Sequence, residues 1–329
     1  MHLTNLRGTR RRRMAVAALL ALSVSLTACG GSDSGGGDTG ADGTTSITVG
    51  VIPIIDVAPI YLGIKQGFFE DEGLDLKLET AEGGAAIVPG VMSGQYQFGF
   101  SNSVSLMLAQ SQGLDIKAVS AGVASTGKDG NDFGGVVVPA DSDIKSAKDL
   151  AGKKIAVNTL KNINTVTINE AVRADGGDPS TIEYVELGFP DIAPAVESGD
   201  VDAGQLVEPF LTIAAGNGDR QVSSNYVATD PSLMVGLYFT SAKYMDENPD
   251  VVDGFTAAMT KSLEYATDHP DEARAILSEY TDIDAGVQEK VVLPAWPTEI
   301  GTDSIDKLAD LMVEDKLVDS KPDSSALLP

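Results

Sequence analysis

Eight polar side chains could bind a small molecule, because each follows a run of residues with strand character. They are Asp56, Ser101, Asn102, Ser103, Asn162, Asn164, Thr165 and Glu208. Hydroxyl and amide groups both donate and accept hydrogen bonds, whereas a carboxylate accepts N–H donors or pairs with a positive charge. In open α/β sheets, ligands settle beyond the carboxyl ends of strands, where helices begin. The pattern therefore predicts a polar binding site built from these eight residues.

Each of these residues also has a structural role open to it. Ser101, Asn102 and Ser103 precede an apolar helical segment and are good N-caps, which stabilise a helix by about 1 kcal/mol. Asp56 can cap locally, and Glu208 can satisfy backbone donors in the first turn of a helix. If the two carboxylates do reach the ligand, they oppose nitrate, sulfonate or bicarbonate and favour N–H donors or positive charge.

Residues for common catalytic chemistry are scarce in this chain. It contains one cysteine, Cys29, and two histidines, His2 and His269. No disulfide framework, CxxC motif or zinc-ligand spacing is present in the sequence. We therefore predict no catalytic residues, no metal site and no cofactor. The formal net charge of −25 makes nucleic-acid binding improbable, because such a surface repels phosphate backbones.

The elements that must position the site alternate between strand and helix, as in an α/β protein. A first series predicts strands at 47–52, 74–78, 98–100 and 116–121, and a second predicts strands at 154–157, 182–187 and 203–207. Segments 91–99 and 196–204 both read Val-x-Ser-Gly with a further glycine five residues on, which indicates two similar lobes. After about residue 234 the pattern is mostly helical, so we expect the tail to return to the first lobe.

The N-terminal segment has the features of an export signal. Arg10 to Arg13 precede a short apolar run, 14–26, that ends in Leu-Thr-Ala-Cys at Cys29. This resembles a bacterial lipoprotein processing signal, which implies cleavage after residue 28 and lipidation of the Cys29 sulfur. Residues 29–46 are rich in Gly, Ser and Asp and are predicted to form a flexible tether. We expect the lipid anchor to be the one membrane contact.

Several motifs resemble one protein family over most of the chain. The segments DVAPIYLG at 56–63 and QGFFEDEGLD at 66–75 are similar to the opening of nitrate/sulfonate/bicarbonate-binding proteins and of binders of thiamine-pyrimidine precursors. Further matches are SGQYQFG at 93–99, SAKDLAGKK at 146–154 and VDA at 201–203, which leads to Glu208. The resemblance implies a two-lobed periplasmic-binding fold (type II) with a two-strand hinge and a central cleft.

The resemblance also implies a function and a domain layout. We expect the substrate-binding component of an ABC importer, which captures a small polar solute by hinge closure and serves a permease and an ATPase. The solute is left open between an oxyanion and a pyrimidine or amine-type nutrient. The alternatives are a solute-sensing lipoprotein that docks on a membrane receptor and, less favoured, an enzyme on the same fold. We expect a monomer outside the cytoplasmic membrane, with lobe 1 at 47–138 plus 235–329 and lobe 2 at 139–234.

Overall fold

The computed structural model describes residues 44–328. The predicted signal peptide, Cys29 and most of the predicted tether lie outside the described residues. The first strand begins at Thr45, so the tether cannot extend to residue 46 as expected. Within residues 44–328, no helix combines the length and the apolar character that membrane crossing requires.

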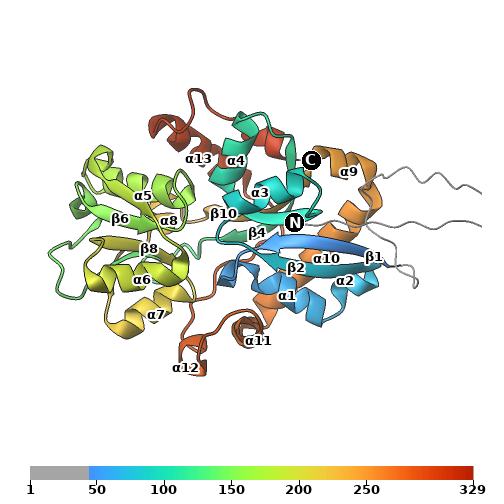
Figure 1. Cartoon of the computed structure of the whole chain (residues 1–329), viewed down its shortest axis with the longest axis horizontal. Helices are drawn as coiled ribbons and strands as arrows, with labels where there is room; N and C mark the ends of the chain where they lie inside the picture. The colour runs from blue at the N-terminus through green and yellow to red at the C-terminus, as the bar shows by residue number, and fades with distance from the viewer. Residues whose placement is uncertain (1–43, 329) are drawn as a thin grey trace, which may run out of the picture. The chain divides into compact units, whose positions relative to one another are not determined.

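The first sheet has five strands in the order β2-β1-β3-β10-β4 (Figure 1). They are β1 (Thr45–Val51), β2 (Leu74–Thr80), β3 (Phe98–Asn102), β4 (Ile116–Ala124) and β10 (Met234–Ser241). β1 lies parallel to both β2 and β3, whereas β10 runs antiparallel to β3 and β4. The parallel strands all end at one edge of the sheet, where a ligand site is expected.

The second sheet repeats this arrangement with the order β7-β6-β8-β5-β9. Its strands are β5 (Gly134–Val138), β6 (Lys154–Val157), β7 (Glu183–Glu186), β8 (Ala203–Val207) and β9 (Arg220–Ser223). β6 is parallel to β7 and β8, and β5 is antiparallel to β8 and β9. β6 therefore corresponds to β1 and β8 to β3. The similar segments at 91–99 and 196–204 lead into β3 and β8, which are equivalent strands.

Helices follow most of the strands in both halves (Figure 1). Those of the first half are α1 (Ala58–Lys65), α2 (Phe68–Asp71), α3 (Gly84–Met92) and α4 (Ser103–Ser111). Those of the second half are α5 (Ile163–Ala174), α6 (Phe189–Ser198), α7 (Phe210–Asn217) and α8 (Asn225–Thr229). The C-terminal helices are α9 (Ala242–Glu247), α10 (Pro249–Asp268), α11 (Pro270–Ala275), α12 (Ala285–Gln288) and α13 (Thr302–Glu314).

The chain passes between the sheets twice, after β4 and again before β10. We call the first sheet with its helices the first lobe, and the second sheet with its helices the second lobe. α10 returns to the first lobe, where it packs on α1 and where Phe255 stacks on Phe98 with ring centroids 4.0 Å apart. This part of the tail therefore packs on the first lobe as expected, whereas α12 contacts α7 of the second lobe.

Two details differ from the sequence-based prediction. The chain beyond β10 is mostly helical as expected, but the sequence analysis named no strand at 234–241, where the eight buried residues of β10 join the first sheet. The proposed lobe boundary at 138/139 would place β5 in the first lobe. Since β5 pairs with β8 and β9, we place the boundary before Gly134.

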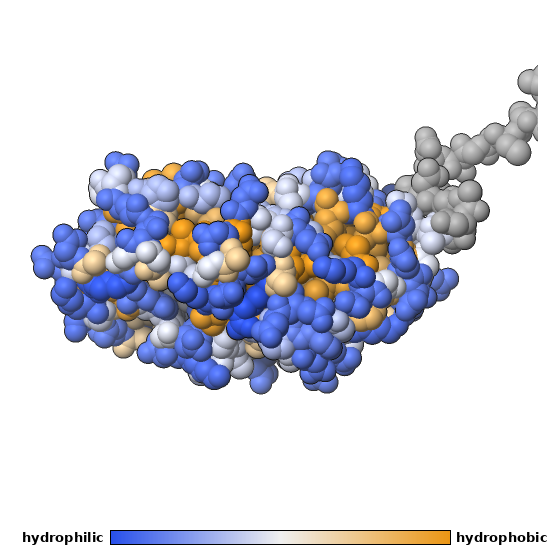
Figure 2. Space-filling view, turned by 90° about the horizontal axis from the view of Figure 1, so that it is seen from below, coloured by the Kyte–Doolittle hydropathy of each residue, from blue (hydrophilic) through white to orange (hydrophobic). Residues whose placement is uncertain are grey.

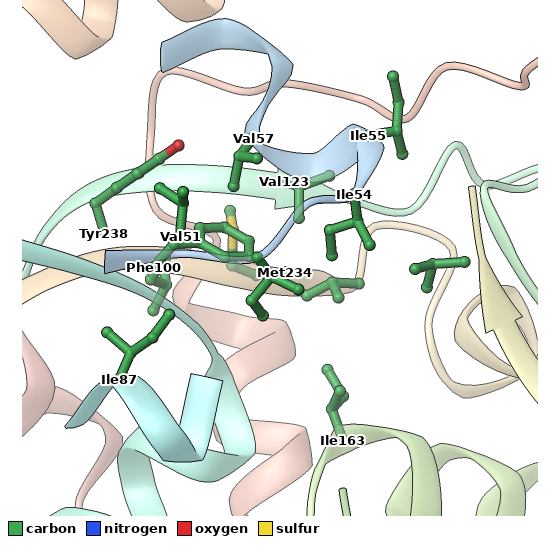
Figure 3. Packing of buried hydrophobic residues seen from close by; sticks show 14 of the residues in the cluster. Val51, Ile54, Ile55, Val57, Ile87, Phe100, Val123, Ile163, Met234 and Tyr238 are labelled. Carbon is green, nitrogen blue, oxygen red and sulfur yellow. The ribbon is translucent and has the colours of Figure 1, made fainter. Parts of the chain in front are cut away.

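A large cluster of buried apolar side chains spans both lobes. Figure 3 shows Ile163, from the start of α5, pointing toward the group that holds Ile54 and Met234 of the first lobe. On the outside, Figure 2 shows a face on which hydrophilic residues cover most of the surface around smaller hydrophobic areas. The lobes therefore meet through apolar contacts close to the ends of their strands.

Candidate functional site

Two adjoining cavities lie where the strand ends of the two lobes meet. The inner cavity has a volume of about 30 Å³ and the outer cavity a volume of about 150 Å³. Both are lined by Ile52, Ile54 and Phe189, so they adjoin, and we refer to them together as the cleft. Because a water molecule needs roughly 10–15 Å³ of such space, the inner cavity is narrow in this arrangement of the lobes.

The wall of the inner cavity combines apolar side chains with six polar ones, and the polar ones come from both lobes. Its polar residues are Asp56 and Asn102 of the first lobe and Asn158, Asn162, Asn164 and Tyr226 of the second. The outer cavity is apolar and aromatic, since Phe189 stacks on Phe210 with centroids 5.9 Å apart. Glu82 is its one charged residue among those described. Within residues 44–328, no lysine, arginine or histidine lines either cavity.

The start of α4 brings one predicted residue to the cleft. Asn102 ends β3 and caps α4, because its Oδ1 accepts a hydrogen bond from the Ser105 amide at 2.9 Å. Its Nδ2 donates to the Ser105 hydroxyl at 3.0 Å. Asn102 is therefore an N-cap that also lines the cavity, and both roles considered from the sequence meet in one side chain.

The start of α5 is the second-lobe counterpart. Asn162 Oδ1 accepts from the Asn164 amide at 3.0 Å, which caps the helix. Asn164 is buried in the same wall, and its Oδ1 accepts the Tyr226 hydroxyl at 2.6 Å. Two helix starts from different lobes thus border one cavity, and each offers the positive end of its dipole to it.

Asp56 supplies the unusual electrostatic feature of this cleft. It lies in the short 3₁₀ turn Ile55–Val57 between β1 and α1, and only 3% of its surface is exposed. Its Oδ1 is buried and accepts no hydrogen bond. Burial raises the pKa of Asp56 to about 8; a hydrogen bond from its own backbone amide opposes this rise and the Asp132 carboxylate adds to it. A buried acceptor without a partner is costly, so a donor on a ligand is the natural partner for it.

A comparison with known proteins gives the family of this chain. The model of a family described as NMT1/THI5 like matches residues 54–273, which include the second sheet, every strand of the first sheet except β1, and most of the residues that line the two cavities. The chain belongs to this NMT1/THI5-like family.

Three curated relatives show the range of activities in the NMT1/THI5-like family. An aliphatic sulfonates-binding protein of Bacillus subtilis is 26% identical over 81% of each chain. A formylaminopyrimidine-binding protein of Halalkalibacterium halodurans is 24% identical over 66% of this chain and 64% of its own length. A 4-amino-5-hydroxymethyl-2-methylpyrimidine phosphate synthase of Aspergillus parasiticus is 25% identical over 69% and 66%. Named relatives thus include binding proteins and an enzyme.

The fold also agrees with solved structures. The alkanesulfonate-binding protein SsuA from Xanthomonas axonopodis pv. citri, bound to MOPS, superposes with a TM-score of 0.73. The match covers 86% of this chain and 98% of that one at 15% identity. This NMT1/THI5-like chain therefore has the two-lobed periplasmic-binding fold that its motifs predicted.

Four of the eight predicted site residues line the inner cavity, namely Asp56, Asn102, Asn162 and Asn164. The other four do not line it; three of them are held by hydrogen bonds within the fold, and the buried Ser101 hydroxyl has no partner among the described residues. Ser103 Oγ donates to the Met234 carbonyl at 2.8 Å, and Thr165 Oγ1 donates to the Asn162 carbonyl at 2.9 Å. Ser101 is fully buried against the backbone of Gly84.

Glu208 is the fourth residue that the structure places elsewhere. It follows β8 and is 1% exposed. Its carboxylate accepts from the Thr212 amide at 3.0 Å, the Thr212 hydroxyl at 2.8 Å and the Val292 amide at 3.1 Å. Burial raises the pKa of Glu208 to about 7, and these hydrogen bonds oppose the rise. Its role is to tie α7 to the chain segment before α13.

Three residues of this NMT1/THI5-like cleft were missed by the sequence analysis. Asn158 follows β6 directly, and this strand-end position was the available signal for it. Phe189 begins α6 after a glycine and reads like a core residue. Tyr226 lies on α8, a short helix without clear periodicity, so no local pattern marked it.

Proposed function

We propose that this chain is the substrate-binding component of an ABC importer. The observation that carries the proposal is the cleft whose polar wall is shared between two lobes of the same topology. A solute that contacts Asp56 on one side and Asn158, Asn162 or Asn164 on the other favours the closed arrangement of the lobes. Closure then presents a distinct surface to a permease that works with an ATPase.

The cleft favours a solute with N–H donors that is neutral or positively charged. Asp56 and Glu82 supply the carboxyl groups that line the two cavities. Among the described residues, neither cavity offers a free oxyanion an arginine, lysine or histidine to pair with its negative charge. The Phe189–Phe210 pair adds an apolar surface that suits the edge or face of a flat ring. An aminopyrimidine, as named for one relative, combines these features.

A thermal-shift panel tests the ligand class directly. Formylaminopyrimidine, MOPS and sodium nitrate are each added to the purified soluble part of the chain. A compound at 100 times its Kd stabilises the protein by about 2.7 kcal/mol. We expect a rise in Tm with formylaminopyrimidine and none with the other two. Stabilisation by nitrate or MOPS alone would overturn the assignment of Asp56 as a ligand acceptor.

We propose further that the protein does not transform its solute. The described residues contain a single histidine, His269. It stacks on Tyr265 and does not line either cavity. The polar side chains of the inner cavity are amides, a phenol and one carboxyl group, which suit recognition more than proton transfer between two groups. Recovery of unchanged formylaminopyrimidine after long incubation, measured by mass spectrometry, is the expected result.

The anchor at Cys29 is part of the same proposal. Lipidation there would hold a monomer at the outer face of the cytoplasmic membrane, near its permease and ATPase. Expression of the full chain and of Cys29→Ser in a bacterial host, followed by membrane fractionation, tests it. We expect the full chain in the membrane fraction and the variant in the soluble fraction. A variant that stays in the membrane and still incorporates labelled lipid would refute the anchor.

A further inference from the structure

Asn158 is the centre of a hydrogen-bond network in the second-lobe wall of the cleft. Its Oδ1 accepts from Asn162 Nδ2 at 2.9 Å and from Asn164 Nδ2 at 2.8 Å. Asn164 Oδ1 accepts the hydroxyl of Tyr226, and that hydroxyl in turn accepts Gln205 Nε2 at 3.3 Å. Because two amide NH₂ groups point at Asn158 Oδ1, the orientation of the Asn158 amide is fixed.

That orientation leaves Asn158 Nδ2 free to bind something else. It donates no hydrogen bond to any residue of the described part of the chain, although Asn158 is only 8% exposed. The other three amide side chains of the inner cavity, Asn102, Asn162 and Asn164, each donate and accept within the protein.

The direction of Asn158 Nδ2 is given by its surroundings. A Cβ atom placed on Gly83, in the first-lobe loop before α3, would lie 3.3 Å from this nitrogen. The nitrogen therefore faces across the cleft toward the first lobe. Asp56 of the first lobe lines the same cavity, and its buried Oδ1 accepts no hydrogen bond. The cleft thus holds one donor and one acceptor that lack partners, and they come from opposite lobes.

We propose that Asn158 is a specificity-determining residue, which donates its Nδ2–H to an acceptor atom of the solute while its Oδ1 positions Asn162 and Asn164. This rests on the proposed function. A preferred solute then carries a hydrogen-bond acceptor for Asn158 in addition to the N–H donor for Asp56. A simple alkylamine, which lacks the acceptor, is rejected because Asn158 Nδ2 would be buried unpaired on closure.

Two substitutions separate the donating role from the positioning role. Asn158→Asp keeps the shape and the oxygen that Asn162 and Asn164 require, but it removes the donor. Asn158→Ala removes both. Calorimetric titration with formylaminopyrimidine is expected to give at least tenfold weaker binding for each variant. Leu160→Asp is the matched control, because Leu160 is 42% exposed in the same loop and the change adds the same charge. We expect it to bind normally.

The outcomes decide between roles. Normal binding by Asn158→Asp together with weak binding by Asn158→Ala would overturn the donating role, because positioning alone would explain it. Normal binding by both would overturn the whole proposal. Equal weakening by Leu160→Asp would assign the effect of Asn158→Asp to charge and would also overturn the donating role.

A second measurement is independent of the ligand class. Side-chain amide exchange by NMR in the unliganded protein should show slow exchange for Asn162 and Asn164 and faster exchange for Asn158. Asn158→Asp should keep the slow exchange at the two partners, and Asn158→Ala should abolish it. Slow exchange of the Asn158 amide itself would refute a free donor, whatever the titration shows. If the unmodified protein binds no formylaminopyrimidine but the exchange pattern holds, the proposed ligand class fails while the network stands.

Discussion

Two pairs of equivalent loops, each pair with one loop from either lobe, differ in whether their polar side chains have partners within the protein. The loops after β1 and β6, which occupy the same position in their sheets, carry Asp56 and Asn158, each with a polar atom that has no partner in the described chain. The ends of β3 and β8, the next equivalent pair, carry Asn102 and Glu208. Asn102 forms hydrogen bonds with Ser105, and Glu208 forms hydrogen bonds with Thr212 and Val292.

The comparison shows that a strand-end position does not by itself make a residue a ligand contact. Asp56 and Glu208 are both buried carboxyl groups after a strand, and burial raises the pKa of each. They differ in whether the protein supplies donors. A carboxylate with three donors stabilises the fold, whereas one with an unpaired oxygen costs stability that a ligand can restore. The predictions below test this division.

The largest effect is expected for Glu208→Ala, and it is an effect on folding. The substitution leaves the amides of Thr212 and Val292 without an acceptor, so we expect a loss of about 3 kcal/mol in the free energy of unfolding. Urea denaturation at pH 6 measures it. Glu208→Gln, which keeps one acceptor oxygen, should lose about 1 kcal/mol. A variant that folds with normal stability but binds formylaminopyrimidine tenfold more weakly would reverse the roles assigned to the two carboxyl groups.

Asp56→Asn is expected to have the opposite profile. The amide has nearly the same shape, but it has one oxygen instead of two and cannot ionise to accept a charge-assisted hydrogen bond when the ligand binds. Loss of one such bond weakens binding by about 2 kcal/mol, or about thirtyfold. At pH 6 the free energy of unfolding should change little, because a neutral amide replaces a carboxyl group whose pKa of about 8 keeps it mostly protonated. Titration calorimetry and denaturation on the same sample test both halves. Loss of stability with unchanged affinity would contradict the comparison.

The dependence of stability on pH is the third prediction. The pKa of Asp56 is about 8 and that of Glu208 about 7 in the folded protein, and both lie above the ordinary carboxyl values of 3.8 and 4.5. The folded state therefore holds more protons than the unfolded state between these limits. The contribution of each group to the free energy of unfolding is therefore complete below about pH 4. It is lost as the pH rises toward 7 for Glu208 or 8 for Asp56.

The size of this slope can be measured by substitution. Each group contributes up to about 1.4 kcal/mol per pH unit in the window from pH 5 to pH 7. Asp56→Asn and Glu208→Gln should each remove one such contribution, and the double variant should remove both. Denaturation curves at half-unit intervals provide the comparison. A slope that is unchanged in Asp56→Asn would show that this carboxyl group is not protonated in the fold.

Much of the fold could be predicted because local patterns and family motifs agreed. The strands before Asp56, Asn102, Asn158 and Glu208 all have short apolar runs that end at polar residues. The strand β10 was missed for a physical reason. All eight of its residues are buried, and a continuous apolar run has no alternation that distinguishes a strand from a buried helix.

The site was predictable only in part, because a strand end determines the place of a residue but not the direction of its side chain. Asn102 and Ser103 are adjacent, yet Asn102 lines the cavity and Ser103 bonds to the Met234 carbonyl. Glu208 depends on the amide of Val292, a partner 84 positions away in the sequence. Such long-range partners decide which polar groups remain available, and no local pattern contains them.

The smallest expected effect concerns the contact between the lobes at Gly83, beside Asn158. The backbone of Gly83 has φ −171° and ψ 162°, an extended conformation that valine adopts readily. A Cβ atom there would lie 2.6 Å from Thr159 Oγ1 of the second lobe. Gly83→Val should therefore fold normally but oppose the approach of the two lobes, which weakens formylaminopyrimidine binding by about fivefold, or about 1 kcal/mol.

Gly216→Val is the matched control for this contact, because a Cβ on Gly216 meets no atom within 4 Å. Small-angle scattering with saturating formylaminopyrimidine should give a larger radius of gyration for Gly83→Val than for the control. Equal radii with equal affinities would mean that the lobes do not need this approach to hold their solute. In that case Asn158 Nδ2, which faces the same loop, would have to reach its acceptor in a more open cleft. The proposal that Asn158 and Asp56 bind one solute from opposite lobes would then lose its geometric basis.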